Sequence, residues 1–362
     1  MNWFHLALDD LFLFLNGLFS VGKDSFSVKS LLLNQELFWV KLGKSHKDVS
    51  EVGGLLQYED YEMLRNKYEK FSEEIPEYKE YVNMFLASGI IKPHKWDELS
   101  ERIVNAVNRN PLSGAREVFL SFDTVALRRR YYTLISNLLA KTKLPGGAKL
   151  KAGFAAPLGV LRELVGLDSK YEKKEISEMC KISGLSEEIL DEFFNQLKLS
   201  ERLQKVGYVE YRKMSKKEYV EELEGEAGDK NIVESLEKFS KRRNLDIMVF
   251  SEDSKFIENA RAFKLQGIRF ESPKDLAKNW KVDWEDVAQL LYTAAVFYGV
   301  LEITPETKIY GIWKGKKDDH WNMEQLKIVT QETKLQKFLE ENYKILRANK
   351  THQEKAKRPA SG

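Results

Sequence analysis

The fold of the central region is decided by the stretch Val118-Phe119-Leu120-Ser121-Phe122-Asp123-Thr124. The stretch begins as a short, mostly apolar run and ends with an acidic and a hydroxyl residue. Beyond it, from Leu127 to Leu138, apolar residues recur at helical spacing. The pattern predicts a buried strand followed by a helix, with Asp123 at the carboxyl end of the strand.

The same order of strand and helix recurs further along the chain. Residues 152–156 predict a second short strand, after which Pro157 opens a helix. Residues 247–251 predict the clearest buried strand, which leads through Asp253 into another helix, and residues 267–270 predict a last strand. This alternation predicts an α/β fold with a parallel sheet and helices on both faces.

Four acidic residues stand where such a sheet would bring them together. Asp123 and Asp253 follow strands, Glu163 lies in the helix after Pro157, and Asp229 begins the helix before the Asp253 strand. Ligands of open parallel sheets bind outside the carboxyl ends of the strands. Converging carboxylates repel one another unless a cation neutralises them, and oxygen ligands suit Mg²⁺ or Mn²⁺. Taken singly, each acid could be a helix cap or a solvated turn residue, but their joint order favours a metal site.

The acids lie in four segments, in this order: Ser121-Phe122-Asp123-Thr124, Val160-Leu161-Arg162-Glu163-Leu164, Gly228-Asp229 and Val249-Phe250-Ser251-Glu252-Asp253. This order resembles the acidic motifs of PIN-domain nucleases over about residues 116–280. The resemblance implies metal-dependent hydrolysis of phosphodiester bonds, usually in RNA. It also implies that Asp123, Glu163, Asp229 and Asp253 are the catalytic and metal-binding acids, with Thr124 supporting the first.

One departure from that pattern keeps an alternative open. Val125 stands where such proteins often carry Asn or Ser, so the polar support of metal-bound water is weaker. The alternative is a nucleic-acid-binding or scaffold protein whose PIN-like core has lost catalysis. The sequence does not separate RNA from DNA as the substrate, or cutting within a strand from cutting at its ends.

Two basic patches are candidates for contacts with nucleic acid. Arg128, Arg129 and Arg130 follow Asp123 by about one helical turn and could grip phosphates at the crevice. A second patch, at Lys314, Lys316 and Lys317, comes directly after Trp313, a combination that suits phosphate contact and base stacking. Either patch could instead be a solvated surface paired with neighbouring acids.

The flanks of the central region predict further modules. We expect a mostly helical N-terminal module over residues 1–113 and the PIN-like domain over residues 114–272. A small C-terminal module, α+β or helical, follows over residues 273–348, where two predicted helices and a hairpin stand in the order of a winged helix. Residues 349–362 are polar and without periodicity, so we expect a disordered tail.

Composition limits the function classes without selecting one. The chain has 362 residues, 43% of them hydrophobic and 31% charged, which indicates a soluble protein of two or three domains. The net charge of +2 is too small for composition alone to indicate binding to nucleic acid or membranes.

Cys180 is the only cysteine, which excludes internal disulfides and favours a cytoplasmic location. The apolar residues 4–19 include acidic residues and lack a basic leader, so we expect neither a signal peptide nor a membrane span. Self-association remains open.

Overall fold

The computed structural model describes residues 3–109, 114–143, 150–166, 169–216, 219–273 and 276–357. The chain divides into two compact units, and each is discontinuous in sequence. The parallel-sheet unit comprises Pro76–Lys170 and Leu197–Leu276. The antiparallel-sheet unit comprises Met1–Ile75, Tyr171–Gln196 and Ala277–Gly362.

A five-stranded parallel sheet forms the centre of the parallel-sheet unit, as the strand and helix alternation predicted. The strands are β5 (Val118–Phe122), β6 (Gly153–Pro157), β7 (Val220–Leu223), β8 (Asp246–Ser251) and β9 (Gln266–Arg269), in the spatial order β7-β6-β5-β8-β9. Every residue of β5 and β6 is buried. Continuous burial is expected of parallel strands because helices cover both faces of their sheet.

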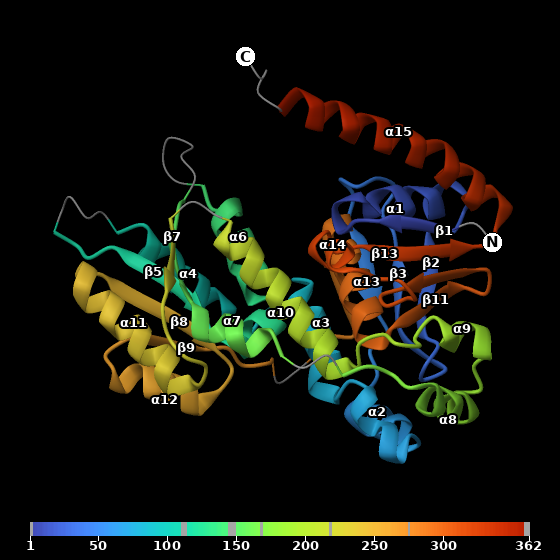
Figure 1. The fold of residues 1–362 in the computed structure, drawn as a ribbon. Helices are drawn as coiled ribbons and strands as arrows, with labels where there is room; N and C mark the ends of the chain where they lie inside the picture. Colours follow the sequence, from blue (N-terminus) through green and yellow to red (C-terminus); the bar gives the residue numbers. More distant parts are fainter. Residues whose placement is uncertain are drawn as a thin grey trace. The chain divides into compact units, whose positions relative to one another are not determined.

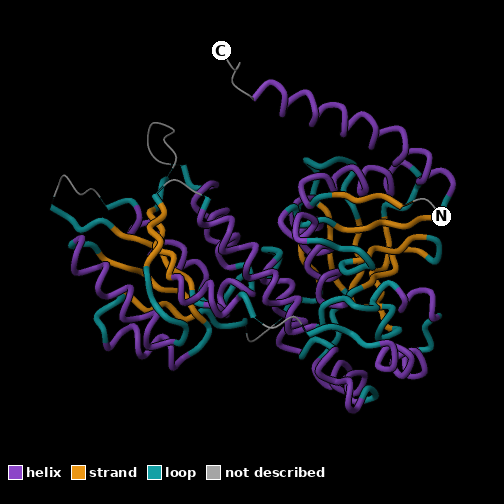
Figure 2. Tube along the Cα trace, in the orientation of Figure 1, coloured by secondary structure: helices purple, strands orange, loops and turns teal. Residues whose placement is uncertain are grey.

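Helices pack on both faces of this sheet, with α6 and α10 on one face and α11 and α12 on the other (Figures 1 and 2). The helices of the unit are α3 (Tyr78–Ala87), α4 (Trp96–Val107), α5 (Thr124–Arg128), α6 (Tyr131–Lys141), α7 (Leu158–Leu164), α10 (Leu199–Ser215), α11 (Asp229–Arg243) and α12 (Ser254–Ala262). The core that they enclose contains Ile103 and Ala106 of α4. Helices α3 and α4, expected in a separate N-terminal module, therefore belong with the parallel sheet.

The other unit is built on an eight-stranded antiparallel sheet. Its strands are β1 (Trp3–Leu6), β2 (Ser25–Ser30), β3 (Gln35–Lys41), β4 (Ser50–Gly53), β10 (Asn279–Val282), β11 (Val300–Thr304), β12 (Thr307–Tyr310) and β13 (Leu326–Thr330). Their spatial order is β1-β13-β12-β11-β2-β3-β4-β10. Strands from both ends of the chain are thus hydrogen-bonded to one another in one sheet.

Helix α13 (Trp284–Tyr298) is the central helix of this unit and is almost wholly buried. It packs on β11 and β12, while α1 (Leu11–Ser20) packs on α13 and on α15 (Thr333–Lys357). At Gly311 the backbone passes so close to the Ala295 carbonyl that a side chain would collide with it. The unit is completed by shorter helices, namely η1 (Leu8–Asp10), α2 (Tyr58–Asn66), η2 (Glu69–Glu74), α8 (Lys173–Ser183), α9 (Glu187–Asp191) and α14 (Asp318–Asn322).

Three expectations about the flanks need correction. Residues 1–113 are not a mostly helical module, because β1 to β4 lie within residues 3–53. In the C-terminal region, α13 and the hairpin β11–β12 are present, but the first of the two expected helices, over residues 272–278, is not seen at the described residues 272–273 and 276–278. Residues 279–282 form strand β10, which pairs with β4. The expected disordered tail is helical up to Lys357 as the end of α15. Residues 110–113, where the first boundary was expected, and residues 358–362 lie outside the described part.

Among the described residues, no helix has both the length and the apolar character that a membrane crossing requires.

Candidate functional site

The strand order places Asp123 at the point where the connections of the parallel sheet change direction. From β5 the chain continues to β6 and β7 on one side, whereas β8 and β9 lie on the other. Asp123 follows β5 directly, and Ser251 is the last residue of the adjacent strand β8. Such switch points are where open parallel sheets bind ligands, so the candidate site begins with these two residues.

Asp123 is buried at the carboxyl end of β5. Its side chain is 5% exposed and accepts hydrogen bonds from the Ala126 backbone N–H at 2.6 Å and from the Ser251 hydroxyl. Burial raises the pKa of Asp123 to about 7; the two hydrogen bonds lower it, and the charges of Asp229 and Glu252 raise it further. Near neutral pH this carboxyl group therefore keeps its proton far more readily than an exposed aspartate does, unless a positive charge compensates it.

Glu163 on α7 is hydrogen-bonded to the residue that follows Asp123 and to the residue that precedes Asp229. One carboxylate oxygen accepts a hydrogen bond from the Thr124 hydroxyl, and the other accepts from the Gly228 backbone N–H at 2.8 Å. Thr124 is the first residue of α5, and Gly228 immediately precedes α11. The Glu163 side chain thus joins the starts of two helices, and Thr124, predicted as a supporting residue, orients Glu163 rather than Asp123.

Asp229 and Asp253 are both exposed to solvent. Asp253 caps α12 and accepts from the backbone N–H groups of Lys255, at 2.7 Å, and Phe256. Asp229 is the first residue of α11, and no hydrogen bond or ion pair holds it within the described part of the chain. Although Asp229 is exposed, partial desolvation by neighbouring protein atoms raises its pKa, and the charges of Asp253 and Glu163 raise it further. The charge of Asp229 is therefore coupled to that of each of the other three predicted acids.

These side chains do not enclose a metal ion as they lie. Within the described ranges, no three or more His, Cys, Asp or Glu residues are arranged to hold one. Both oxygens of Asp123 and both oxygens of Glu163 accept hydrogen bonds from protein groups. The donor set consists of carboxylates, the chemistry that hard divalent cations require, but only Asp229 is without such bonds.

Two residues of the site were not predicted to take part. Ser251 accepts a hydrogen bond from the Asp253 backbone N–H at 2.9 Å while donating to Asp123, so one hydroxyl links two of the acids. Glu252 is only 8% exposed. It accepts from the Tyr131 hydroxyl and pairs with Arg129 at 2.9 Å. The sequence signal was the position of both residues between the end of β8 and Asp253.

The three consecutive arginines have three different environments. Arg130 is 1% exposed and faces the equally buried Glu210 at 3.6 Å. Arg129 is 15% exposed and paired with Glu252. Arg128 is half-buried and forms no ion pair with any described residue, and its Nε is buried without a hydrogen-bond partner. Only one of the three is therefore placed to meet a ligand.

The three lysines of the second basic patch, Lys314, Lys316 and Lys317, also differ in their environments. Lys314 and Lys317 are exposed, and Lys314 pairs with Asp191 at 3.1 Å. The Lys316 ammonium donates to backbone carbonyls and lies 3.8 Å from the centre of the Trp321 ring. Lys316 therefore holds the loop after β12 in place.

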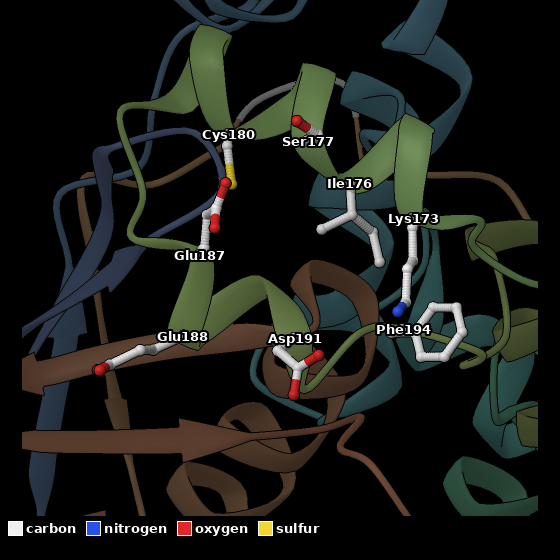
Figure 3. Close-up of a pocket in the computed structure, with 8 residues that line it drawn as sticks. All are labelled: Lys173, Ile176, Ser177, Cys180, Glu187, Glu188, Asp191 and Phe194. Carbon is white, nitrogen blue, oxygen red and sulfur yellow. The ribbon is translucent and has the colours of Figure 1, made fainter.

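A separate pocket of about 590 Å³ opens between α8 and α9 in the antiparallel-sheet unit (Figure 3). Cys180 lines this pocket with part of its surface exposed. Burial raises the pKa of its thiol, and the facing Glu187 raises it further. On the other side of the pocket, the Lys173 ammonium lies 5.1 Å from the centre of the Phe194 ring. None of the predicted acids or basic residues lines the pocket.

Comparison of the chain with protein-family models, with curated proteins and with solved structures finds no match.

Proposed function

We propose that this protein is a metal-dependent nuclease of the PIN type that hydrolyses phosphodiester bonds in RNA. The observation that supports the proposal is that the charge of Asp229 acts on, or is acted on by, those of Asp123, Glu163 and Asp253, with Asp123 at the switch point of the parallel sheet. The four residues come from different elements. Carboxyl groups whose pKa values are raised by burial and by neighbouring negative charges are typical of functional sites. The single cysteine is consistent with action in the cytoplasm.

The four acids would hold Mg²⁺ or Mn²⁺. When bound, such an ion supplies an activated water and neutralises charge on the phosphate. The protein's contribution is to orient the carboxylates: Ser251 and the Ala126 N–H fix Asp123, while Thr124 and the Gly228 N–H fix Glu163. Because the described side chains do not already surround an ion, binding requires the exposed acids to turn inward. Asp229, which has no hydrogen bond to give up, is best placed to do so.

Cleavage of labelled RNA in Mn²⁺ or Mg²⁺, with and without chelator, tests the proposal. We expect Asp123→Asn and Asp253→Asn each to abolish cleavage and chelator to stop it. Asp246→Asn is the matched control: Asp246 begins β8 at the opposite edge of the sheet and pairs with Arg109, so cleavage should persist. Cleavage retained by the Asp123 and Asp253 variants, with a contaminant excluded, would contradict the proposal.

A second candidate function is nucleic-acid binding without catalysis. It is favoured by Val125, which offers no polar group next to Thr124, and by the lack of a formed metal site among the described residues. Wild-type protein that binds RNA but cleaves neither RNA nor DNA in either metal would support this candidate over the first.

The proposal includes a second nucleic-acid contact in the C-terminal region. Helix α13 and the hairpin β11–β12 follow one another in the order of a winged helix. Both strands already have neighbours on each side in the sheet, so a contact would use the loop after β12, where Lys314 and Lys317 are exposed. Replacing both with Gln should weaken binding of long RNA more than binding of short RNA.

A further inference from the structure

Arg128 differs from its two neighbours in having no carboxylate partner. Arg129 and Arg130 are held by Glu252 and Glu210 respectively. Each of the three has a buried guanidinium nitrogen without a hydrogen-bond partner, namely Arg128 Nε, Arg129 Nη1 and Arg130 Nε, but only Arg128 also lacks an ion pair with a described residue. A buried donor without an acceptor is costly and is usually explained by a ligand, an ion or a water molecule that completes its hydrogen bonds.

Arg128 is the last residue of α5, the short helix that Asp123 caps and whose first residue, Thr124, donates to Glu163. Burial lowers the pKa of Arg128, and the charges of Glu163, Asp123 and, from α3, Glu80 act in the opposite direction. The aliphatic stem passes over Gly207 of α10, where a Cβ would lie 3.2 Å from the Arg128 Cγ. Close packing of α5 on α10 therefore restricts the stem.

A phosphodiester group would supply the missing acceptor. Arginine presents N–H donors in a planar arrangement that matches two phosphate oxygens, and it cannot lose its proton near neutral pH. A phosphate bound next to Glu163 and Asp123 would meet this guanidinium on one side and the acid group on the other. Neither Arg129 nor Arg130 could contribute without breaking an existing ion pair.

We propose that Arg128 alone among the three arginines binds a backbone phosphate of single-stranded RNA at the acidic site, and that Arg129 and Arg130 maintain the fold. The choice of RNA as the ligand rests on the proposed function.

The test is binding of a fluorescein-labelled 12-nucleotide RNA, measured by anisotropy in EDTA so that no cleavage occurs. Loss of one phosphate contact should flatten the plot of log affinity against log salt by about 0.7. We expect this change in Arg128→Gln and not in Arg129→Gln. Arg109→Gln is the matched control, because Arg109 is a surface arginine paired with Asp246 at the opposite edge of the sheet. Arg128→Lys should keep the wild-type slope while binding more weakly, since lysine is a point charge.

An unchanged slope in Arg128→Gln, with an unchanged melting temperature, would overturn the inference. An equal loss in Arg129→Gln, or wild-type protein that does not bind the RNA, would also overturn it. Inorganic phosphate that displaces the RNA at submillimolar concentration would assign Arg128 to free phosphate instead. If wild-type protein binds with the expected slopes but never cleaves in Mn²⁺, the proposed catalysis fails while the role of Arg128 stands.

Discussion

Burial strongly disfavours the ionised form of the Asp123 carboxyl group. The group lies at the end of a central strand and faces Asp229 and Glu252, and its pKa rises to about 7. The folded protein therefore holds a proton there that the unfolded chain releases near pH 4. Any cation that binds this carboxylate near neutral pH must first displace that proton, so cation affinity should increase with pH up to about 7.

The first prediction concerns the pH dependence of stability. Because the folded-state pKa is raised, the stabilisation is complete below about pH 4 and is lost as the pH rises through 7. Asp123→Asn removes this titration, so the wild-type free energy of unfolding should fall relative to the variant between pH 5 and 8. The expected change is on the order of 2–3 kcal/mol. Urea unfolding in EDTA at both pH values measures it.

Asp246→Asn serves as the control, since Asp246 is partly exposed and paired with Arg109. It should run parallel to the wild type across the same pH range. Parallel curves for Asp123→Asn and the wild type would instead show that Asp123 is ionised throughout.

At the residue scale the sequence located the acids better than their partners. Asp123 and Asp253 could be placed because each follows a recognisable apolar strand. The role of Ser251 depends on the pairing of β8 with β5, which brings its hydroxyl to Asp123. The burial of Glu252 depends on Tyr131 and Arg129, which are distant in sequence. Such contacts are set by tertiary packing, which periodicity does not report.

At the scale of elements, the junction of α7 with α11 determines how Glu163 is held. Gly159 on α7 approaches the Glu226 carbonyl so closely that a Cβ would collide with it, and Ile232 lies at 3.0 Å from the same point. The segment that would be displaced ends at Gly228, whose N–H binds Glu163. Close contact between helices here therefore supports a side chain of the candidate site.

The second prediction is that Gly159→Ala destabilises the protein by about 1–3 kcal/mol, because the backbone of residue 226 must shift. The Glu163 hydrogen bond from Gly228 should weaken at the same time, so RNA cleavage, where present, should fall more than that of a variant of equal stability. Gly225→Ala is the control: its nearest neighbour, the Ser235 Cβ, lies at 3.3 Å, and it should cost less. Chemical denaturation of the two variants measures the difference, and equal stability would contradict the account.

Elements with local signals were predicted, and those defined by distant partners were not. The buried strand β8 and the helices around it follow from apolar runs and helical spacing. Strand β2, over Ser25–Ser30, also alternates buried and less buried residues. It was not predicted, because the alternation is short and lies in a region that was expected to be mostly helical. Strand β10 is a strand because Asn279–Val282 pair with Ser50–Gly53. The continuation of α15 reflects the good helix formers Lys, Gln, Glu and Ala after residue 350.

At the scale of the whole molecule, the chain leaves the parallel-sheet unit after Lys170 and returns at Leu197. These two residues pair in an antiparallel bridge, and the Lys198 N–H donates to the Ser169 carbonyl at 3.0 Å. The ends of the excursion are therefore already as close as the ends of a hairpin. Dividing the sequence into contiguous domains could not predict this arrangement, because the composition does not change where the chain passes from one unit to the other.

The third prediction is that residues 171–196 can be removed from a chain of residues 76–276. An Asn-Gly turn joining Lys170 to Leu197 suits a two-residue hairpin connection. We expect the shortened chain to unfold in a single cooperative transition by circular dichroism, because the whole core of the parallel sheet remains. The same chain joined by a long Gly-Ser linker is the control and should be slightly less stable. A molten or aggregated product from both chains would contradict the independence of this unit.

The pairing of β1 with β13 has a consequence for the order of events during synthesis. Trp3–Leu6 leave the ribosome early, yet their partners Leu326–Thr330 follow only after the whole parallel-sheet unit has been translated. At roughly 5–20 residues per second, the first strand waits tens of seconds for its neighbour. The parallel-sheet unit can therefore complete its sheet while β1 still lacks its neighbour β13, so the antiparallel sheet is completed after the parallel one.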